Sequence, residues 1–270
     1  MNNSKQDSYK SDDVSQGEQF ADDSDSDMPS EAYELTIKKG ILAVIVMYAC
    51  QIIAGAGVSY MLQYLYPTAE IEIEFIGLFS ILISGVLVLL LFWWDLHRSG
   101  TDLYPQIGLQ SSTIKNSKAV LLVVIALAGT HFLAWIYRSV ILPMYDQGGI
   151  IGGGSKMFSF IQENGSGVEM TMFLVLALVV GPVMEEVVFR GYLQSSLAKR
   201  LPVWVAIVIT SFVFMAGHNP MVLWPMYFMF SAVWGWVYVR TGSLKMAILI
   251  HVLSNLYYTI IGFAGWDILA

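Results

Sequence analysis

The segment GPVMEEVVFRGYLQ places charged residues inside an otherwise apolar stretch of the 270-residue chain. A charge at the centre of a membrane helix costs roughly 2.5–3.5 kcal/mol on insertion scales, so such residues usually face a polar cavity and serve function. Glu186 and Arg190 are four residues apart, so they share a helix face and can pair. Glu185 lies about 100° round the helix and keeps no fixed counter-ion. We therefore expect Glu185 to activate water, while Glu186 and Arg190 hold the helix and the substrate geometry.

Histidines in two later apolar stretches could take part in the same chemistry. His218 ends SFVFMAGHNP, and His251 lies in ILIHVLSNLYY with Asn255 one turn later on the same face. Two hydrogen-bond donors that point in one direction can stabilise the oxyanion that develops in acyl transfer. A lone intramembrane histidine more often makes a helix-packing hydrogen bond, and that is our interpretation of His131. His97 is expected at a membrane interface.

The composition defines the class of protein that must position these residues. The chain is 56% hydrophobic and 13% charged, with a mean hydropathy of +0.61, whereas soluble domains are nearer a quarter charged. An ordinary cytosolic enzyme is excluded, as is a nucleic-acid binder, which needs a basic face. The single cysteine, Cys50, excludes a disulfide scaffold or a metal site built from cysteines. The composition indicates an all-α, polytopic transmembrane helical bundle.

Seven stretches are apolar over about the 20 residues that a helix needs to span a bilayer. The predicted spans are 40–66, 75–94, 119–141, 168–188, 202–218, 221–239 and 245–265. In the fourth, the apolar run breaks at the two glutamates, and His218-Asn219-Pro220 separates the fifth and sixth as a tight hairpin. Glycines predict a loop over 143–167, with a short amphipathic piece at Phe158–Ile161. A re-entrant or split helix would bring the count to eight.

Basic residues cluster in alternate loops. They are Lys38 and Lys39 before the first span, Arg98, Lys115 and Lys118 after the second, Lys199 and Arg200 after the fourth, and Arg240 and Lys245 after the sixth. Positive charge favours the cytoplasmic side of a membrane. We therefore expect a multi-pass protein of the cell membrane with a cytoplasmic N-terminus and an external C-terminus.

The net charge of −7 belongs to the start of the chain. Residues 1–34 hold ten acids against Lys5 and Lys10, a charge of −8, and the remainder carries +1. This polar, Ser/Asp-rich stretch cannot bury enough surface to fold, and it lacks the apolar core of a signal peptide. The predicted organisation is a disordered acidic cytoplasmic tail over 1–36 and a transmembrane domain over 37–270. A solubilising role is favoured for the tail over a regulatory or partner-binding one.

Three motifs occur in order on three apolar helices, namely Glu185-Glu186-x-x-x-Arg190, Phe214-x-x-x-His218 and His251-x-x-x-Asn255. The set resembles the CPBP family, the CAAX prenyl protease and bacteriocin-processing (Abi) group of intramembrane endopeptidases, which is related to the Ras-converting CAAX protease. The resemblance covers about residues 168–262, the expected catalytic core. It implies a helical fold whose polar cavity opens to one aqueous side and laterally to lipid.

The resemblance also implies a function and a division of labour. The expected activity is hydrolysis of a peptide bond in a membrane-associated or lipidated peptide or protein that reaches the site from the lipid bilayer. No nucleic-acid partner is expected. The polar residues form three pairs with distinct implied roles, namely Glu185 and His218 for activating water, Glu186 and Arg190 for support and orientation, and His251 and Asn255 for the oxyanion hole.

Other catalytic chemistries were weighed on the same residues. Glu185, His218 and His251 could form a catalytic zinc site with an open position, although the HExxH signature is absent. Similarity to the CAAX enzymes favours a mechanism without a cofactor. Serine chemistry is disfavoured because Ser166 lies in a loop, and aspartyl chemistry because Asp95 is only at the edge of a span.

Two alternatives without peptidase activity also remain from the sequence. A non-catalytic bacteriocin-immunity or scaffold protein could use the same cavity for binding, and the intact motifs barely separate it from an enzyme. A proton-coupled transporter could use Glu185 and His218 as a relay. The absence of an internal repeat counts against the transporter.

Overall fold

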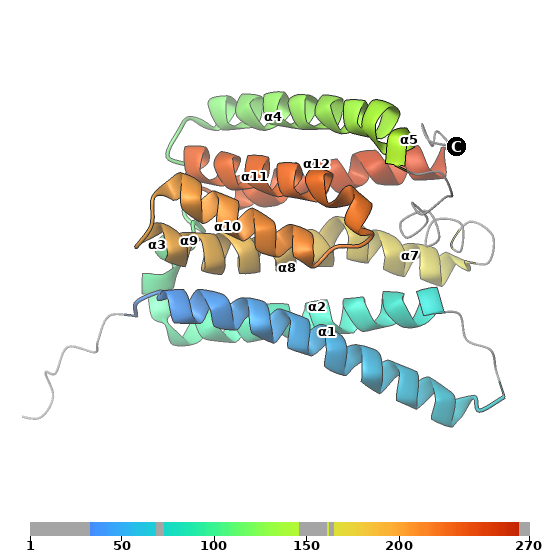
Figure 1. The fold of residues 1–270 in the computed structure, drawn as a ribbon. Helices are drawn as coiled ribbons and strands as arrows, with labels where there is room; N and C mark the ends of the chain where they lie inside the picture. The colour runs from blue at the N-terminus through green and yellow to red at the C-terminus, as the bar shows by residue number, and fades with distance from the viewer. Residues whose placement is uncertain (1–32, 69–72, 146–160, 162–164, 265–270) are drawn as a thin grey trace, which may run out of the picture. The chain divides into compact units, whose positions relative to one another are not determined.

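The computed structural model describes residues 33–68, 73–145, 161 and 165–264 (Figure 1). The described residues are helical and contain no strand, which confirms the predicted all-α fold class. Most of the predicted acidic tail lies outside the described residues. So does the predicted amphipathic piece at Phe158–Ile161, apart from Ile161.

Six helical stretches in the described part of the chain are long and apolar enough to cross a bilayer. They comprise α1 (Ile37–Leu65), α2 (Ile73–Arg98), α4 (Asn116–Ile136) with η2 (Tyr137–Ile141) and α5 (Leu142–Tyr145), the segment from α7 to α9, η5 (Met221–Leu223) with α11 (Trp224–Thr241), and α12 (Leu244–Phe263). A seventh apolar helix, α10 (Val203–Ala216), has 14 residues. This arrangement confirms a polytopic helical bundle.

The fourth span is longer than the apolar pattern predicts. Its five pieces follow one another without a break as α7 (Gly167–Val175), η3 (Leu176–Val180), α8 (Gly181–Glu186), η4 (Val187–Gln194) and α9 (Ser195–Ala198). The expected end at residue 188 is therefore wrong by ten residues. The helix passes through its two glutamates because polar partners from the same and neighbouring helices compensate them inside the bundle. Both η3 and η4 are π-helical, a form that often occurs at functional sites.

The fourth span is also the element around which the others pack. Helices α1 and α10 contact η4, while α2 and α12 contact α8, and Figure 1 shows α8 between these layers. Met184, Val188 and Phe189 are each 1% exposed or less. The outer helices, by contrast, expose large apolar side chains such as Ile52 and Trp204, as expected for a surface that meets lipid tails.

Two hydrogen bonds to Asp95 join the segment before α1 and the helical piece η4 to α2. The Asp95 carboxylate accepts from the hydroxyls of Tyr33 at 2.8 Å and Tyr192 at 2.7 Å. Burial, followed by the hydrogen bond to Asp95, raises the pKa of the Tyr33 hydroxyl above its ordinary value. The Tyr33 hydroxyl therefore stays protonated and can keep its hydrogen bond to Asp95 across the physiological pH range. The two tyrosines connect the segment before α1 and the central span to α2.

Candidate active site

The buried ion pair of Glu186 and Arg190 is the innermost part of the site. Arg190 Nη1 donates to Glu186 Oε1 at 2.9 Å, and both side chains are 0% exposed. Arg190 Nη2 also donates to the carbonyl oxygen and hydroxyl of Ser231 at 2.8 and 2.9 Å. The spacing of four residues thus produces the pairing expected from it. The two hydrogen bonds from Arg190 to Ser231 connect the central span to α11.

His251 reaches this pair from α12 and connects the two adjacent glutamates. Its Nδ1 lies 2.8 Å from Glu186 Oε1, which already accepts from Arg190. Because that oxygen belongs to an ion-paired carboxylate, Nδ1 is the donor. The other ring nitrogen, Nε2, lies 3.8 Å from Glu185 Oε2. The imidazole stacks on Trp234, with ring centroids 4.0 Å apart. The ring orientation of His251 is therefore fixed both by this stacking and by the hydrogen bond to Glu186.

His218, just past the C-terminal end of α10, approaches Glu185 from the other direction. Its Nδ1 donates to the Phe214 carbonyl at 2.7 Å, since a carbonyl can only accept. Its ring stacks on that of Phe214 at 4.4 Å. The Nε2 atom lies 4.0 Å from Glu185 Oε2. Both histidines therefore use Nδ1 as an anchor and direct Nε2 toward one carboxylate.

The side chains of this cluster differ in their exposure. The side chains of His218 and Glu185 are 28% and 21% exposed, whereas those of His251 and Glu186 are 5% and 0%. A molecule that reaches the cluster from outside the fold therefore meets Glu185 and His218 before the other two. The adjacent glutamates occupy different environments even though one peptide bond joins them.

The Asn255 side chain is hydrogen-bonded to the backbone of the central span. Its side-chain nitrogen donates to the Ala177 carbonyl in η3 at 2.8 Å. The described side-chain hydrogen bonds of Asn255 do not include one to Glu185, His218 or His251. An amide group carries two hydrogens, so one donor remains beyond this bond. Asn255 thus lies one turn from His251 and holds α12 to the central span.

Aromatic residues around the cluster were not identified from the sequence. The Trp234 ring stacks on that of His251. The Tyr227 ring lies 4.7 Å from that of His218. The Tyr48 ring from α1 lies against Gly217, where an added Cβ would meet the Tyr48 hydroxyl. Aromatic residues in apolar helices look alike in sequence whether they line a site or fill a core, so no signal could have separated these three.

The other two histidines lie apart from this cluster. Both ring nitrogens of His131 are buried and have no hydrogen-bond partner among the described residues, so the expected packing hydrogen bond is absent. Its ring instead contacts those of Tyr257 at 4.2 Å and Tyr258 at 5.2 Å. His97 stacks on Trp93 in the last turn of α2.

The zinc alternative depends on Glu185, His218 and His251. Among the described residues, no group of three or more His, Cys, Asp or Glu side chains has the arrangement of a metal site. An anchored Nδ1 with an open Nε2 is typical both of catalytic histidines and of histidines that bind metals. The separations of 3.8 and 4.0 Å leave space for a small group between the carboxylate and the imidazoles.

Comparison with known proteins points to one family for this part of the chain. Residues 167–257 match the family described as type II CAAX prenyl endopeptidase, Rce1-like. The membrane-embedded CAAX protease MroQ of Staphylococcus aureus (strain USA300) is 29% identical over 93 residues, which cover 32% of this chain and 38% of MroQ. No solved structure matches. The matched range contains all seven named residues of the three motifs, and the predicted family resemblance is confirmed over it.

Proposed function

We propose that this chain, whose residues 167–257 match the Rce1-like CAAX prenyl endopeptidase family, is an intramembrane endopeptidase. Its substrate would be a membrane-associated or lipidated peptide or protein. One observation carries the proposal: Glu185 Oε2 lies 4.0 Å from His218 Nε2 and 3.8 Å from His251 Nε2. These three groups meet at the exposed side of an otherwise buried polar cluster.

The first chemical step is activation of water by Glu185 and His218. Separations near 4 Å are too long for a direct hydrogen bond, but they suit two groups that share one water molecule. Glu185 takes one proton as the water oxygen attacks the carbonyl carbon of the scissile bond. His218 Nε2 accepts a hydrogen bond from the other O–H of that water. Glu185 then returns its proton to the leaving nitrogen as the C–N bond breaks.

Charge balance supports a protonated His251. Glu185, Glu186 and Arg190 together carry −1, which is costly in a buried site unless a cation compensates. An imidazolium at His251 makes the cluster neutral, because Nδ1 faces Glu186 at 2.8 Å and Nε2 faces Glu185 at 3.8 Å. Its Nε2–H is then a donor for the oxyanion, joined by the second amide hydrogen of Asn255.

The test is cleavage by the purified full chain in liposomes. The probes are a farnesylated peptide with a CAAX ending and a set of unmodified hydrophobic peptides, with products identified by mass spectrometry. We expect cleavage of at least one probe, reduced about 100-fold or more in Glu185→Ala and His218→Ala. The control is Glu169→Gln, an acid in the first turn of the same span whose capping bonds glutamine can keep.

Two results would contradict the proposal. Failure of the wild-type chain to cleave any probe would favour the non-catalytic scaffold. Wild-type activity in a folded Glu185→Ala variant would remove the proposed base. Treatment with a chelator tests the metal alternative. If the chelator abolishes cleavage and added zinc restores it, Glu185, His218 and His251 would be reassigned as zinc ligands.

A further inference from the structure

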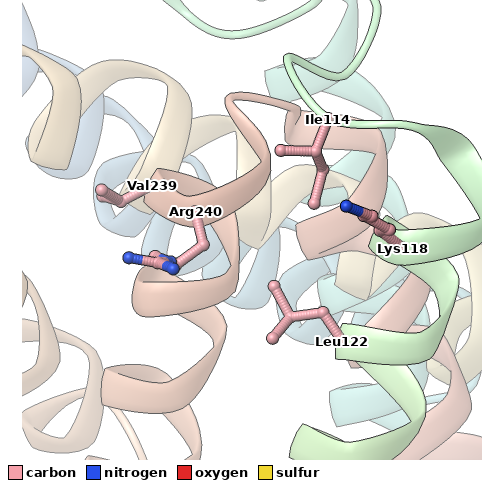
Figure 2. A pocket seen from close by; sticks show the side chains of 5 residues that line it. All are labelled: Ile114, Lys118, Leu122, Val239 and Arg240. Atoms are coloured by element: carbon pink, nitrogen blue, oxygen red, sulfur yellow. The ribbon is translucent and has the colours of Figure 1, made fainter.

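A hollow of about 470 Å³ lies between α4 and α11, away from the peptidase cluster. Figure 2 shows Ile114, Lys118 and Leu122 on one side of it and Val239 and Arg240 on the other. Two cationic side chains and three aliphatic ones therefore line the same space. This combination suits a molecule with one anionic end and one apolar end.

The two cations have no acidic partner in the part of the chain that the structure describes. Among the described residues, no carboxylate lies within ion-pair distance of Lys118 or Arg240, and both residues are exposed. The Arg240 guanidinium lies over the Trp236 ring at 5.9 Å, and tryptophan is enriched where membrane meets water. The positive charge at the hollow is thus uncompensated by the described protein.

The positions of these residues along their helices match the depth of a lipid headgroup. Lys118 lies in the first turn of the span that begins at Asn116, and Arg240 in the last turn of the span that ends at Thr241. Leu122 follows Lys118 by one turn on the same face of α4, toward the membrane interior. The charged groups therefore lie at the headgroup level, and the aliphatic groups lie at or below it.

The rim of the hollow is held in place by hydrogen bonds between segments far apart in sequence. The Thr241 carbonyl at the end of α11 accepts from the Thr113 backbone N–H at 2.8 Å and from the Ser112 hydroxyl at 3.1 Å. The Leu244 N–H donates to the Gly108 carbonyl at 2.7 Å. The loop that carries Ile114 is consequently attached to the turn between α11 and α12, and the hollow is preorganised.

The same end of the bundle carries most of the basic residues. Lys38 lies in the first turn of α1, Arg98 ends α2, Lys199 follows α9 and Lys245 lies in the first turn of α12, and Figure 1 shows these helix ends together. By the positive-inside rule this end faces the cytoplasm, where the leaflet is rich in anionic lipids.

We propose that the hollow binds one anionic phospholipid. Its phosphate lies between Lys118 and Arg240, and an acyl chain packs against Leu122 and Val239. This site is independent of the peptidase cluster, because it shares no residue with it.

The experiment counts lipid bound to the purified full chain in detergent by native mass spectrometry. Phosphatidylglycerol, zwitterionic phosphatidylcholine and inorganic phosphate are titrated separately. We expect one tightly held phosphatidylglycerol, with affinity about tenfold lower in Lys118→Gln/Arg240→Gln. Leu122→Trp, which keeps both charges and fills the hollow, should weaken binding as well. Unchanged thermal unfolding without added lipid shows that each variant is folded.

The matched control is Arg98→Gln/Lys245→Gln, which also removes two positive charges at the basic end. Arg98 lies over the Trp94 ring at 4.7 Å, as Arg240 lies over Trp236. This variant should bind phosphatidylglycerol like the wild type. The proposal is overturned if the control loses as much affinity, if phosphatidylcholine binds equally well, or if inorganic phosphate alone occupies the site.

Discussion

At the residue scale, the two adjacent glutamates differ in what contacts them. Glu186 is fully buried and its Oε1 accepts from both Arg190 and His251. Glu185 has only the longer approaches of two imidazoles and is 21% exposed. Two adjacent positions in one helix therefore give one buried, ion-paired carboxylate and one partly exposed carboxylate.

Replacement of Glu186 by glutamine should destabilise the fold more than the same change at Glu185. Glu186→Gln leaves the Arg190 guanidinium buried without a counter-charge, which costs about 3–5 kcal/mol when a buried pair is broken. Glu185→Gln removes no ion pair of this kind and should change the stability by less than about 1 kcal/mol. Thermal unfolding in detergent measures the difference. Equal stability of the two variants would contradict the division of roles.

Replacement of Asn255 by alanine should lower kcat about 100-fold with little change in KM, because an oxyanion donor acts mainly in the transition state. The lost bond to the Ala177 carbonyl should reduce stability by about 1 kcal/mol. Steady-state kinetics on a cleaved probe, together with thermal unfolding, measure both effects. Ser254→Ala is the neighbouring control, since the Ser254 hydroxyl is buried and has no hydrogen-bond partner among the described residues. A kcat that stays at the wild-type value would assign Asn255 to helix packing alone.

At the element scale, close backbone approach positions α1 against the central span. A Cβ at Gly40 would lie 3.0 Å from the Tyr192 carbonyl oxygen and would also meet the Ser196 hydroxyl. The same helix exposes Gly57, where an added Cβ meets nothing within 4 Å. The small residue at position 40 thus allows α1 to contact η4, the piece that carries Arg190.

Gly40→Val should therefore destabilise the protein by about 1–3 kcal/mol, because the side chain overpacks a contact with backbone that cannot move aside. Gly57→Val is the matched control on the same helix and should leave stability nearly unchanged. The unfolding temperature of each purified variant is the measurement. A loss at Gly57 as large as that at Gly40 would show that helix propensity, and not packing, dominates.

At the scale of the whole molecule, the asymmetric charge predicts sidedness. Ser117 and Met144 lie near opposite ends of the same span and are both exposed. In a Cys50→Ser background, Met144→Cys should react with a membrane-impermeant maleimide on intact cells. Ser117→Cys should react only after the cells are opened, because the positive-inside rule predicts that the basic end faces the cytoplasm. The opposite labelling pattern would reverse the orientation and place the proposed lipid in the outer leaflet.

The amino-acid sequence alone determined the membrane class, the apolar helices, the Glu186–Arg190 pair and the resemblance to the CAAX protease family. Each of these depends on composition or on spacing within one helix, where geometry follows directly from the backbone repeat. It also predicted that the acids and histidines belong to one site, but without the distances that decide their chemistry.

The tertiary structure alone decided how the helices meet. His251 contacts a glutamate 65 positions earlier in the chain, Trp234 orients its ring, and Asn255 bonds to a carbonyl of the central span. The central helix continues to Ala198 because its charges are compensated by partners on its own turns and on other helices. Such contacts depend on how side chains of separate helices pack, and no repeat within a single helix encodes that packing.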